Sequence, residues 1–258
     1  MVGIGKAFRL RRICRKDGRS LIVAMDHAFF GTVMPGLKEP DETIKKVIRG
    51  GADAIMTTFG VIKQCYEILA GNVAVIWTIP TDPGYAETAV KMGVDAVKIT
   101  YFGEMQDRDA LRKIGVVAEE CEKWEMPLLA EIVPGTRTKE GEFKYSCEVK
   151  DVKTAARCGA EQGADFVKTS YTGSVESFKE VVDSCFVPVL ILGGPRIEAD
   201  EQVLTTVKEA IEAGGAGVAF GRNVWQHKDP TAMTRAIARI LHEEASVKEA
   251  LEELSVRS

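Results

Sequence analysis

Lys168 has the sequence context of a nucleophilic amine. It closes a short apolar run that contains Phe166 and Val167, and Gly163 and Gly173 bound this stretch on either side. A cation between apolar strand residues is costly to bury unless it is paired or neutralised. Desolvation lowers the pKa of an amine, and a neutral amine at a strand end can attack a carbonyl carbon to form a Schiff base. The alternative from this stretch alone is a lysine that reaches the surface or pairs with a carboxylate.

Three further charged residues are expected near Lys168. Lys98 and Lys168 each lie five residues after a glycine that opens a repeated segment, so their side chains should point the same way at a similar level. Two inward ammonium groups would lower each other's pKa, which favours a nucleophilic amine. Asp26 and Glu131 are the carboxylates available to move protons or to pair with the lysines. The alternative is a structural network of four charges, although inward charges in a protein core need a function to offset their desolvation.

Two glycine-containing segments late in the chain predict a phosphate site. Gly193 and Gly194 follow one expected strand, and Gly221 and Arg222 follow the next. Glycine lets backbone N–H groups approach an anion closely, and an arginine adds a forked, charge-assisted contact. The alternative is that these glycines only form tight turns. His27, at the end of the first expected strand, is a further candidate for substrate binding.

Strands and helices alternate along the chain, which is typical of a parallel sheet with crossover helices. Strands are expected at residues 20–26, 52–57, 73–79, 95–100, 127–133, 164–170, 188–192 and 216–220. Helices are expected at residues 41–49, 61–69, 86–92, 107–124, 152–162, 175–184, 201–213 and 231–243. We therefore expect eight βα units in a single domain, 1–258, with residues 1–19 as a lead-in and residues 244–258 as a C-terminal helical tail.

Two openings recur among these strands. The first reads GADAI at 51–55, GVDAV at 93–97, GADFV at 163–167 and GGAGV at 214–218. The second reads MPLLA at 126–130 and VPVLI at 187–191. An open doubly wound sheet has no reason for this fourfold repeat, whereas a closed ring built from a repeated two-strand unit does. The sequence predicts an α/β fold, a single (β/α)8 TIM barrel, whose working residues lie at the carboxyl ends of the strands.

Composition excludes several classes of function. The 258 residues carry a formal net charge of −4 with scattered lysines, which gives no nucleic-acid-binding surface. Six widely spaced cysteines without a CxxC pair indicate reduced thiols rather than a disulfide framework or a zinc site. The first residues lack the apolar run of a signal peptide, and no apolar run reaches membrane-spanning length. We therefore expect a cytoplasmic protein with no metal, no other cofactor and no membrane partner.

Several motifs together resemble the archaeal-type class I aldolases. They read MDH at 25–27, VKTSYTG at 167–173, GGP at 193–195 and VAFGRNVWQ at 218–226, within a likeness that extends from about residue 8 to residue 254. This group includes fructose-1,6-bisphosphate aldolase, 2-amino-3,7-dideoxy-D-threo-hept-6-ulosonate synthase and autoinducer-2 thiolase. The resemblance implies homo-oligomers, often decamers of two rings. It also implies a Schiff-base lysine at Lys168, proton transfer by Asp26, and a phosphate site at Gly193, Gly194, Gly221 and Arg222.

The chain departs from this family pattern in several places. The aldolases usually carry a catalytic tyrosine where this chain has Val133, and a bulky aromatic residue or methionine where it has Glu131. The glycine usual after the Asp-His pair is Ala28, the segment 78–85 is shorter than in the sugar aldolases, and Lys98 is not a family residue. Because side chains alternate along a strand, Glu131 shares a face with Val133. Glu131 is therefore predicted to replace the tyrosine, with Lys98 polarising the substrate.

Three functions remain open from the sequence. The first is an enzyme that makes or breaks a carbon–carbon bond through a Schiff base on a phosphorylated keto sugar or related keto compound. The second is acyl transfer from a phosphorylated diketone, as in the thiolase branch of the resembling family. The third is a degenerate aldolase that only binds sugar phosphates. Borohydride trapping separates the first from the third, and dependence on coenzyme A identifies the second.

Overall fold

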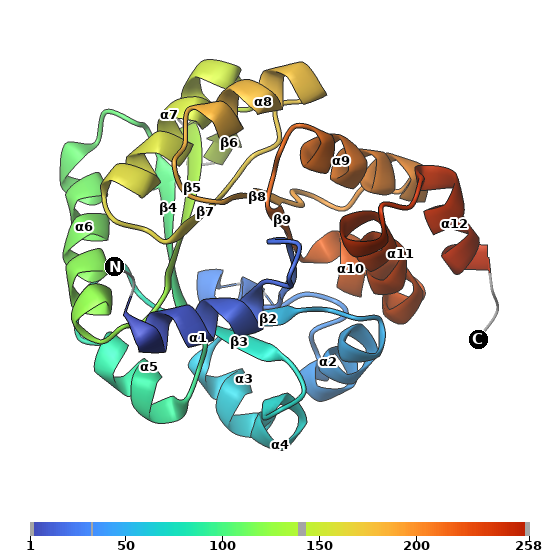
Figure 1. Cartoon of the computed structure of the whole chain (residues 1–258), viewed down its shortest axis with the longest axis horizontal. Coiled ribbons are helices and arrows are strands. Elements are labelled where there is room, and N and C mark those ends of the chain that lie inside the picture. Colours follow the sequence, from blue (N-terminus) through green and yellow to red (C-terminus); the bar gives the residue numbers. More distant parts are fainter. Residues whose placement is uncertain (1–2, 32, 139–142, 256–258) are drawn as a thin grey trace.

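The computed structural model describes residues 3–31, 33–138 and 143–255. Within them, eight parallel strands close into a barrel surrounded by helices (Figure 1). Each strand pairs with its two neighbours, and the last pairs with the first. In ring order the strands are β1 (Ser20–Ala24), β2 (Ala54–Thr57), β3 (Ala74–Thr78), β4 (Ala96–Gly103), β5 (Leu128–Arg137), β7 (Phe166–Thr169), β8 (Val189–Leu192) and β9 (Gly217–Phe220). The predicted (β/α)8 barrel is confirmed.

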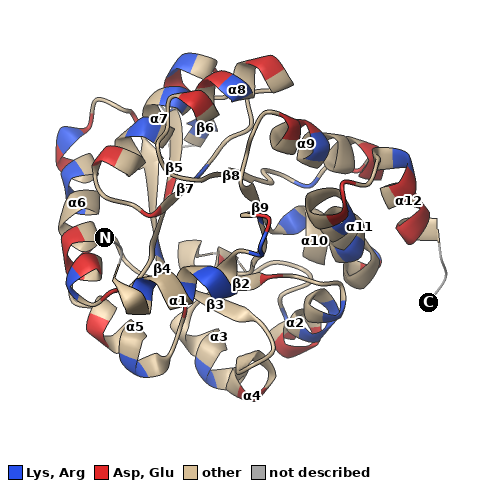
Figure 2. Ribbon diagram, in the orientation of Figure 1, with Lys and Arg blue, Asp and Glu red and all other residues tan. Residues whose placement is uncertain are grey.

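The helices between the strands form the outer layer. They are α2 (Pro40–Arg49), α3 (Phe59–Gln64), α4 (Tyr66–Leu69), α5 (Ala86–Met92), α6 (Arg108–Lys123), α7 (Val149–Glu161), α8 (Val175–Asp183), α9 (Asp200–Glu212), α10 (Arg222–Trp225) and α11 (Pro230–Glu243). The helix expected at 61–69 is divided at Cys65 into α3 and α4, and α10 was not predicted. Charged residues lie mainly on the helices, whereas the strands are largely uncharged (Figure 2). Among the described residues, no helix is long and apolar enough to span a membrane.

Alternating side chains divide each strand between two layers. Val97 and Ile99 of β4 belong to the apolar layer between strands and helices, whereas Ala96 belongs to the layer inside the barrel. By the same alternation, Lys98 and Thr100 point inward. Charged residues at inner positions are therefore exceptions in an otherwise apolar interior, and they mark where the site is built.

Strands β4 and β5 continue beyond the barrel rim and support an additional strand. They stay paired as far as Gly103 and Pro134. Strand β6 (Phe143–Tyr145) then pairs antiparallel with the end of β5. This hairpin was not predicted, because three residues are too few to show the two-residue period of a strand.

A helix also forms in the lead-in, where none was predicted. Helix α1 (Ile4–Ile13) lies across the end of the barrel where the strands begin, and its Leu10 and Ile13 pack against the inner layer (Figure 1). The predicted tail forms α12 (Val247–Ser255), which packs against α11 and α9. Residues 1–2 of the lead-in and 256–258 of the tail lie outside the described residues.

The aspartates of the repeated openings hold α1 and the residues just after it in place. Three basic residues each pair with one of them: Lys6 with Asp165, Arg12 with Asp95 and Arg15 with Asp53. The other oxygen of each carboxylate accepts a hydrogen bond from a backbone N–H at a neighbouring strand, from Leu128, Val75 and Leu21 respectively. The repeat therefore carries a structural role at the end of the barrel opposite to the predicted site.

The fourth repeat has Ala216 at the aspartate position, and its next residue is Gly217. The φ of Gly217 is +129°, and a Cβ at this position would lie 2.0 Å from the carbonyl oxygen of Ser20. No side chain fits there, so only glycine is tolerated. Ser20 itself holds the end of α1 here, since its Oγ donates a hydrogen bond to the carbonyl oxygen of Ile13 at 2.8 Å.

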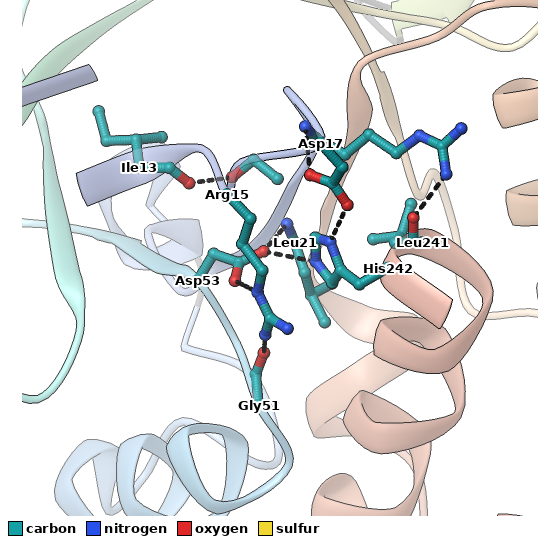
Figure 3. A network of polar contacts seen from close by, with 10 residues as sticks. Ile13, Arg15, Asp17, Leu21, Gly51, Asp53, Leu241 and His242 are labelled. Atoms are coloured by element: carbon teal, nitrogen blue, oxygen red, sulfur yellow. Dashed lines mark hydrogen bonds and ion pairs between the residues drawn. The ribbon is translucent and has the colours of Figure 1, made fainter. Parts of the chain in front are cut away.

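A buried histidine connects α11 to the same end of the barrel (Figure 3). Nδ1 of His242 lies 2.7 Å from Asp17, and Nε2 lies 2.9 Å from Asp53. Both ring nitrogens can donate to carboxylates only when the imidazole is protonated. Burial alone would lower the pKa of His242, but its hydrogen bonds to Asp53 and Asp17 and the charge of Asp53 raise that pKa above the ordinary value of 6.5.

We expect His242→Gln to destabilise the protein more at about pH 6 than at about pH 9. Because the folded-state pKa is raised, the stabilisation is fully present below the unfolded pKa and is lost as the pH rises through the folded pKa. Hydrogen bonds to charged groups are typically worth about 1.5–3 kcal/mol, so the effect at the lower pH should be of this order. Thermal unfolding of both proteins at the two pH values measures it. Equal losses of Tm would show that the folded protein holds a neutral imidazole.

Candidate active site

Four charged side chains meet inside the barrel, at the carboxyl ends of its strands. Asp26 follows β1, Lys98 lies on β4, Glu131 on β5 and Lys168 on β7. All four are buried, with relative exposures from 0% for Lys98 to 6% for Glu131. Glu131 and Lys168 are directly paired in the register of β5 and β7, which brings these two side chains together. The structure therefore brings together all four predicted catalytic residues.

Glu131 is the centre of this cluster. Its Oε2 lies 2.5 Å from Nζ of Lys98, and its Oε1 lies 2.6 Å from Nζ of Lys168. Nζ of Lys98 also lies 2.9 Å from Oδ2 of Asp26. Two ammonium and two carboxylate groups thus form a chain without net charge. This pairing makes their burial tolerable, since removing one partner of a buried pair typically costs about 3–5 kcal/mol.

Two threonines orient the carboxylates. Thr78 at the end of β3 donates a hydrogen bond to Oδ2 of Asp26 at 2.8 Å, and Thr100 on β4 donates to Oε2 of Glu131 at 3.3 Å. Neither threonine was singled out from the sequence. The signal for Thr100 was available, because it lies two residues after Lys98 and therefore shares its inward face.

Both carboxylates are held in the ionised form. Burial alone would raise the pKa of Asp26, but the charges of Lys98 and Lys168 and hydrogen bonds from Lys98 and Thr78 lower it to about 2. Burial likewise acts to raise the pKa of Glu131, and the charges of the two lysines outweigh it and lower that pKa. Each carboxylate is therefore available as a base at neutral pH.

The predicted lowering of the pKa by lysine–lysine repulsion is wrong for Lys98. Burial does act to lower its pKa, but the charges and hydrogen bonds of Asp26 and Glu131 outweigh burial and raise it above the ordinary 10.5. The sequence indicated that both lysines face inward, but it did not show that Glu131 lies between them. With this carboxylate between the two amines, Lys98 is a stable cation.

The two predicted phosphate loops lie side by side, and one side chain forms hydrogen bonds between them. Asn223, at the start of α10, donates a hydrogen bond to the carbonyl oxygen of Gly193 at 2.7 Å and accepts one from the N–H of Ile197 at 2.8 Å. Gly194 has a φ of +61° and open space where a Cβ would be. Asn223 was not among the predicted site residues, although it lies beside two of them in the sequence.

His27 lies next to the second of these loops. Its ring packs edge-on against Trp225 at a centroid distance of 5.3 Å, and the indole N–H donates to the carbonyl oxygen of Ala24 at 2.8 Å. A Cβ on Gly221 would lie 3.4 Å from Cε1 of His27 and 2.9 Å from that same carbonyl oxygen, so a side chain at position 221 would crowd both. Burial, with the charges of Arg222 and Lys168, lowers the pKa of His27 despite the opposing effect of Asp26.

Four polar atoms beside these loops are buried without a hydrogen-bond partner among the described residues. They are Nδ1 of His27, Nε of Arg222, and Nε and Nη1 of Arg196. Unpaired buried donors are unfavourable, and they are expected where a ligand supplies the missing acceptor. The two loops thus combine backbone freedom at glycine with unsatisfied polar groups, which suits an anion.

Val133 lies one inward position above Glu131 on β5. It is fully buried and pairs with Phe102 of β4, whereas Glu131 pairs with Thr100. The level at which the resembling family carries a tyrosine is therefore apolar here. Among residues 3–31, 33–138 and 143–255, no three His, Cys, Asp or Glu side chains are grouped to hold a metal ion.

Enzymes that work through a lysine Schiff base use an amine beside a carboxylate, and in a (β/α)8 barrel such groups lie at the carboxyl ends of the strands. Residues 20–227 match the family model described as DeoC/LacD family aldolase. The match covers most of the chain, which therefore belongs to this aldolase family.

Similar proteins agree with this assignment. The chain is 32% identical to an uncharacterized aldolase from Saccharolobus solfataricus, over 96% of this chain and 98% of the relative. It is 34% identical to the 2-amino-3,7-dideoxy-D-threo-hept-6-ulosonate synthase of Halobacterium salinarum, over 97% of both chains. An archaeal fructose-1,6-bisphosphate aldolase whose catalytic lysine is covalently bound to a carbinolamine intermediate has a similar structure, with a TM-score of 0.77 and 27% identity over 92% of this chain and 99% of the other. This protein is a class I aldolase, an enzyme that makes or breaks a carbon–carbon bond.

Proposed function

We propose that Lys168 forms the Schiff base, with a phosphorylated keto sugar or a related keto compound as substrate. The observation that carries this proposal is the unequal environment of the two lysines. Lys98 is fully buried between two carboxylates, whereas Lys168 contacts one carboxylate and its side chain keeps 6% exposure. An incoming carbonyl group can reach Lys168 without first separating Lys98 from both of its partners.

Glu131 is proposed to carry the protons of this reaction. Transfer of a proton from Lys168 to Glu131 across their 2.6 Å contact leaves a neutral amine, which attacks the keto carbon. The carbonyl oxygen takes up a proton, and the resulting carbinolamine loses that oxygen as water to give an iminium. When the neighbouring carbon–carbon bond breaks, the iminium accepts its electron pair, and Asp26 or Glu131 removes the proton of the hydroxyl group that becomes the aldehyde. The same carboxyl group returns this proton to the carbon of the enamine that is left on Lys168, and hydrolysis of the resulting iminium releases the ketone and restores Lys168.

Lys98 is proposed to remain charged while these protons move. Its raised pKa and its contacts with Asp26 and Glu131 support this role. A fixed cation in a buried site stabilises the alkoxide that forms when the substrate hydroxyl group loses its proton, because little solvent screens it. It also keeps Asp26 ionised when Lys168 has given up its charge.

The phosphate group is proposed to bind at Gly193, Gly194, Gly221 and Arg222, with His27 beside it. The unpaired Nε of Arg222 and Nδ1 of His27 support this placement, because a phosphate oxygen would satisfy them. The open space at Gly194 supports a close approach of backbone N–H groups.

Lys168→Met should abolish borohydride trapping of dihydroxyacetone phosphate and of fructose 1,6-bisphosphate, because Lys98, the other amine of the cluster, is enclosed by two carboxylates. Lys98→Met should retain measurable trapping. The mass of the intact protein and of its peptides reports the adduct and its position. Lys91→Met, which alters an exposed lysine, serves as the control and should trap like the unmodified enzyme. An adduct mapped to Lys98 would contradict the assignment.

Glu131→Gln should lose turnover by about 10²–10⁴-fold, the usual contribution of a general acid–base group, yet still form a trappable imine. Steady-state turnover and borohydride trapping on the same preparation measure the two effects. If Glu131 served only to balance Lys98, the double variant Glu131→Met, Lys98→Met would recover both Tm and activity. An active double variant is therefore the outcome that excludes the catalytic role.

Arg222→Ala should weaken binding of dihydroxyacetone phosphate by roughly tenfold or more and leave dihydroxyacetone almost unaffected. A charge-assisted hydrogen bond is typically worth about 1.5–3 kcal/mol, which sets this scale. Calorimetric titration in a Lys168→Met background prevents turnover during the measurement. Arg157→Ala, at an exposed arginine on α7, is the matched control. Equal losses for both ligands would assign Arg222 a structural role.

A further inference from the structure

A continuous row of aromatic rings stands at the carboxyl end of the barrel over β4 and β5. Phe30 contacts Phe102 at a centroid distance of 5.7 Å, and Phe102 contacts Phe143 at 5.6 Å. Phe143 in turn contacts Tyr145 at 5.2 Å, and Phe29 packs behind Phe30 at 5.4 Å. We call Phe30, Phe102, Phe143 and Tyr145 the aromatic wall.

Three separate elements contribute to the aromatic wall. Phe30 comes from the short 3-10 helix after β1 (His27–Phe30), Phe102 from the extended end of β4, and Phe143 from β6. The backbone of Gly135 makes room for this arrangement, since a Cβ there would lie 2.6 Å from Cζ of Phe143. The hairpin that the sequence did not reveal is thus the element that completes the wall.

The aromatic wall is continuous with the reaction centre. Nζ of Lys98 lies 5.1 Å from the centroid of the Phe30 ring, within the range of a cation–π contact. Phe102 faces inward on β4, in register with Val133, one inward position above Thr100 and Glu131. A substrate bound at Lys168 and Glu131 therefore has the aromatic wall immediately above it.

The wall is more exposed than a packing role requires. Phe30 keeps 46% of its relative exposure and Tyr145 keeps 47%. Contiguous exposed apolar side chains on a soluble protein usually mark a binding surface. Because this surface begins at a catalytic ammonium group, its most direct occupant is the substrate.

The charge distribution separates this side of the mouth from the phosphate loops. Lys144 lies between Phe143 and Tyr145 on β6, and Lys144 and Tyr145 both line a cavity of about 570 Å³ with Glu104 and Asp151. The guanidinium of Arg137 lies over Phe143, 6.0 Å from the ring centroid. Among the described residues, this side of the mouth thus presents four aromatic rings with the guanidinium of Arg137 over one of them, whereas the other side presents the glycine loops and Arg222.

We propose that the aromatic wall binds the fragment of the substrate that is not attached to Lys168, and that this fragment is an aldehyde with a flat or apolar group in place of a second phosphate. The proposal rests on the Schiff-base function proposed above. In the synthetic direction, the enamine carbon on Lys168 bonds to the aldehyde carbon, and the aldehyde oxygen takes a proton from Glu131. In cleavage the same bond breaks and the proton returns. Stacking against Phe30 and Phe102 would hold the aldehyde with its carbonyl carbon toward the amine.

Binding of two non-reacting probes tests the wall without requiring turnover. The probes are 3-phenylpropan-1-ol for the wall and glycerol 3-phosphate for the glycine loops. Phe102→Ala should weaken 3-phenylpropan-1-ol roughly tenfold and leave glycerol 3-phosphate unchanged, whereas Arg222→Ala should do the reverse. Phe186→Ala is the matched control, because Phe186 is 63% exposed with Arg157 over its ring but lies outside the wall. It should change neither affinity.

Chemical-shift titration gives both dissociation constants, and sedimentation of each variant reports its assembly. The proposal is overturned if Phe102→Ala and the unmodified enzyme bind 3-phenylpropan-1-ol with equal affinity. It is also overturned if the unmodified enzyme does not bind this probe. A change of oligomeric state in Phe102→Ala or Phe30→Leu, with unchanged probe binding, would instead assign the wall to a subunit contact.

Acceptor choice provides the second measurement. With dihydroxyacetone phosphate bound to Lys168 as the unreduced enamine, phenylacetaldehyde should form and release an aldol product faster than glyceraldehyde 3-phosphate does. Phe30→Leu should reduce this preference. The proposal is overturned if the enzyme prefers glyceraldehyde 3-phosphate and Arg137→Ala removes that preference. If the proposed Schiff-base function is wrong, the unmodified enzyme shows no borohydride trapping. The probe titrations do not depend on that function, so they still decide whether the aromatic wall binds aromatic ligands.

Discussion

The carboxylate of Glu131, shared between two lysine ammonium groups, is the interaction on which the site depends. Each lysine alone would be a charge in an apolar barrel, and such a charge is strongly disfavoured without a partner. With Glu131 at 2.5 Å from Lys98 and 2.6 Å from Lys168, and with Asp26 on the far side of Lys98, the cluster is neutral. The same geometry places a carboxylate base within reach of the proposed nucleophile. The contact that makes burial of Lys168 tolerable is therefore also the one proposed to remove its proton.

Charge pairing at the opposite end of the barrel serves a different purpose. Arg12 and Arg15 pair with buried aspartates of the repeat, but their own side chains remain 52% and 45% exposed. Partly solvated pairs of this kind contribute little each, while removal of a partner from a sealed cluster is costly. The barrel thus uses ion pairs to attach α1 and α11 where the strands begin, and holds a cluster of four buried charges at the carboxyl ends of its strands.

Local patterns in the sequence were sufficient for the barrel but not for the contacts that complete it. The repeated openings and apolar runs predicted the strands, and alternation correctly pointed Lys98 and Glu131 inward. The residue that pairs with each charged side chain lies on a strand distant in the sequence. The sequence therefore did not predict the raised pKa of Lys98. Strand β6 was missed because it forms only by pairing with the end of β5, and α1 because its packing surface is the barrel itself. Long-range contacts, rather than propensity, decide these features.

The positions of Glu131 and Val133 on β5 set the depth of the site. Glu131 lies two residues nearer the start of β5, which corresponds to a displacement of roughly 6–7 Å along a strand. Proposed proton transfer then occurs at the level of Thr100 and Lys168, while Val133 and Phe102 form an apolar collar above it. A phosphate at the proposed site on the rim loops and a carbon bonded, as proposed, to Lys168 would be joined through that collar. The collar therefore favours a short phosphorylated fragment on Lys168, and places the remaining fragment against aromatic rings.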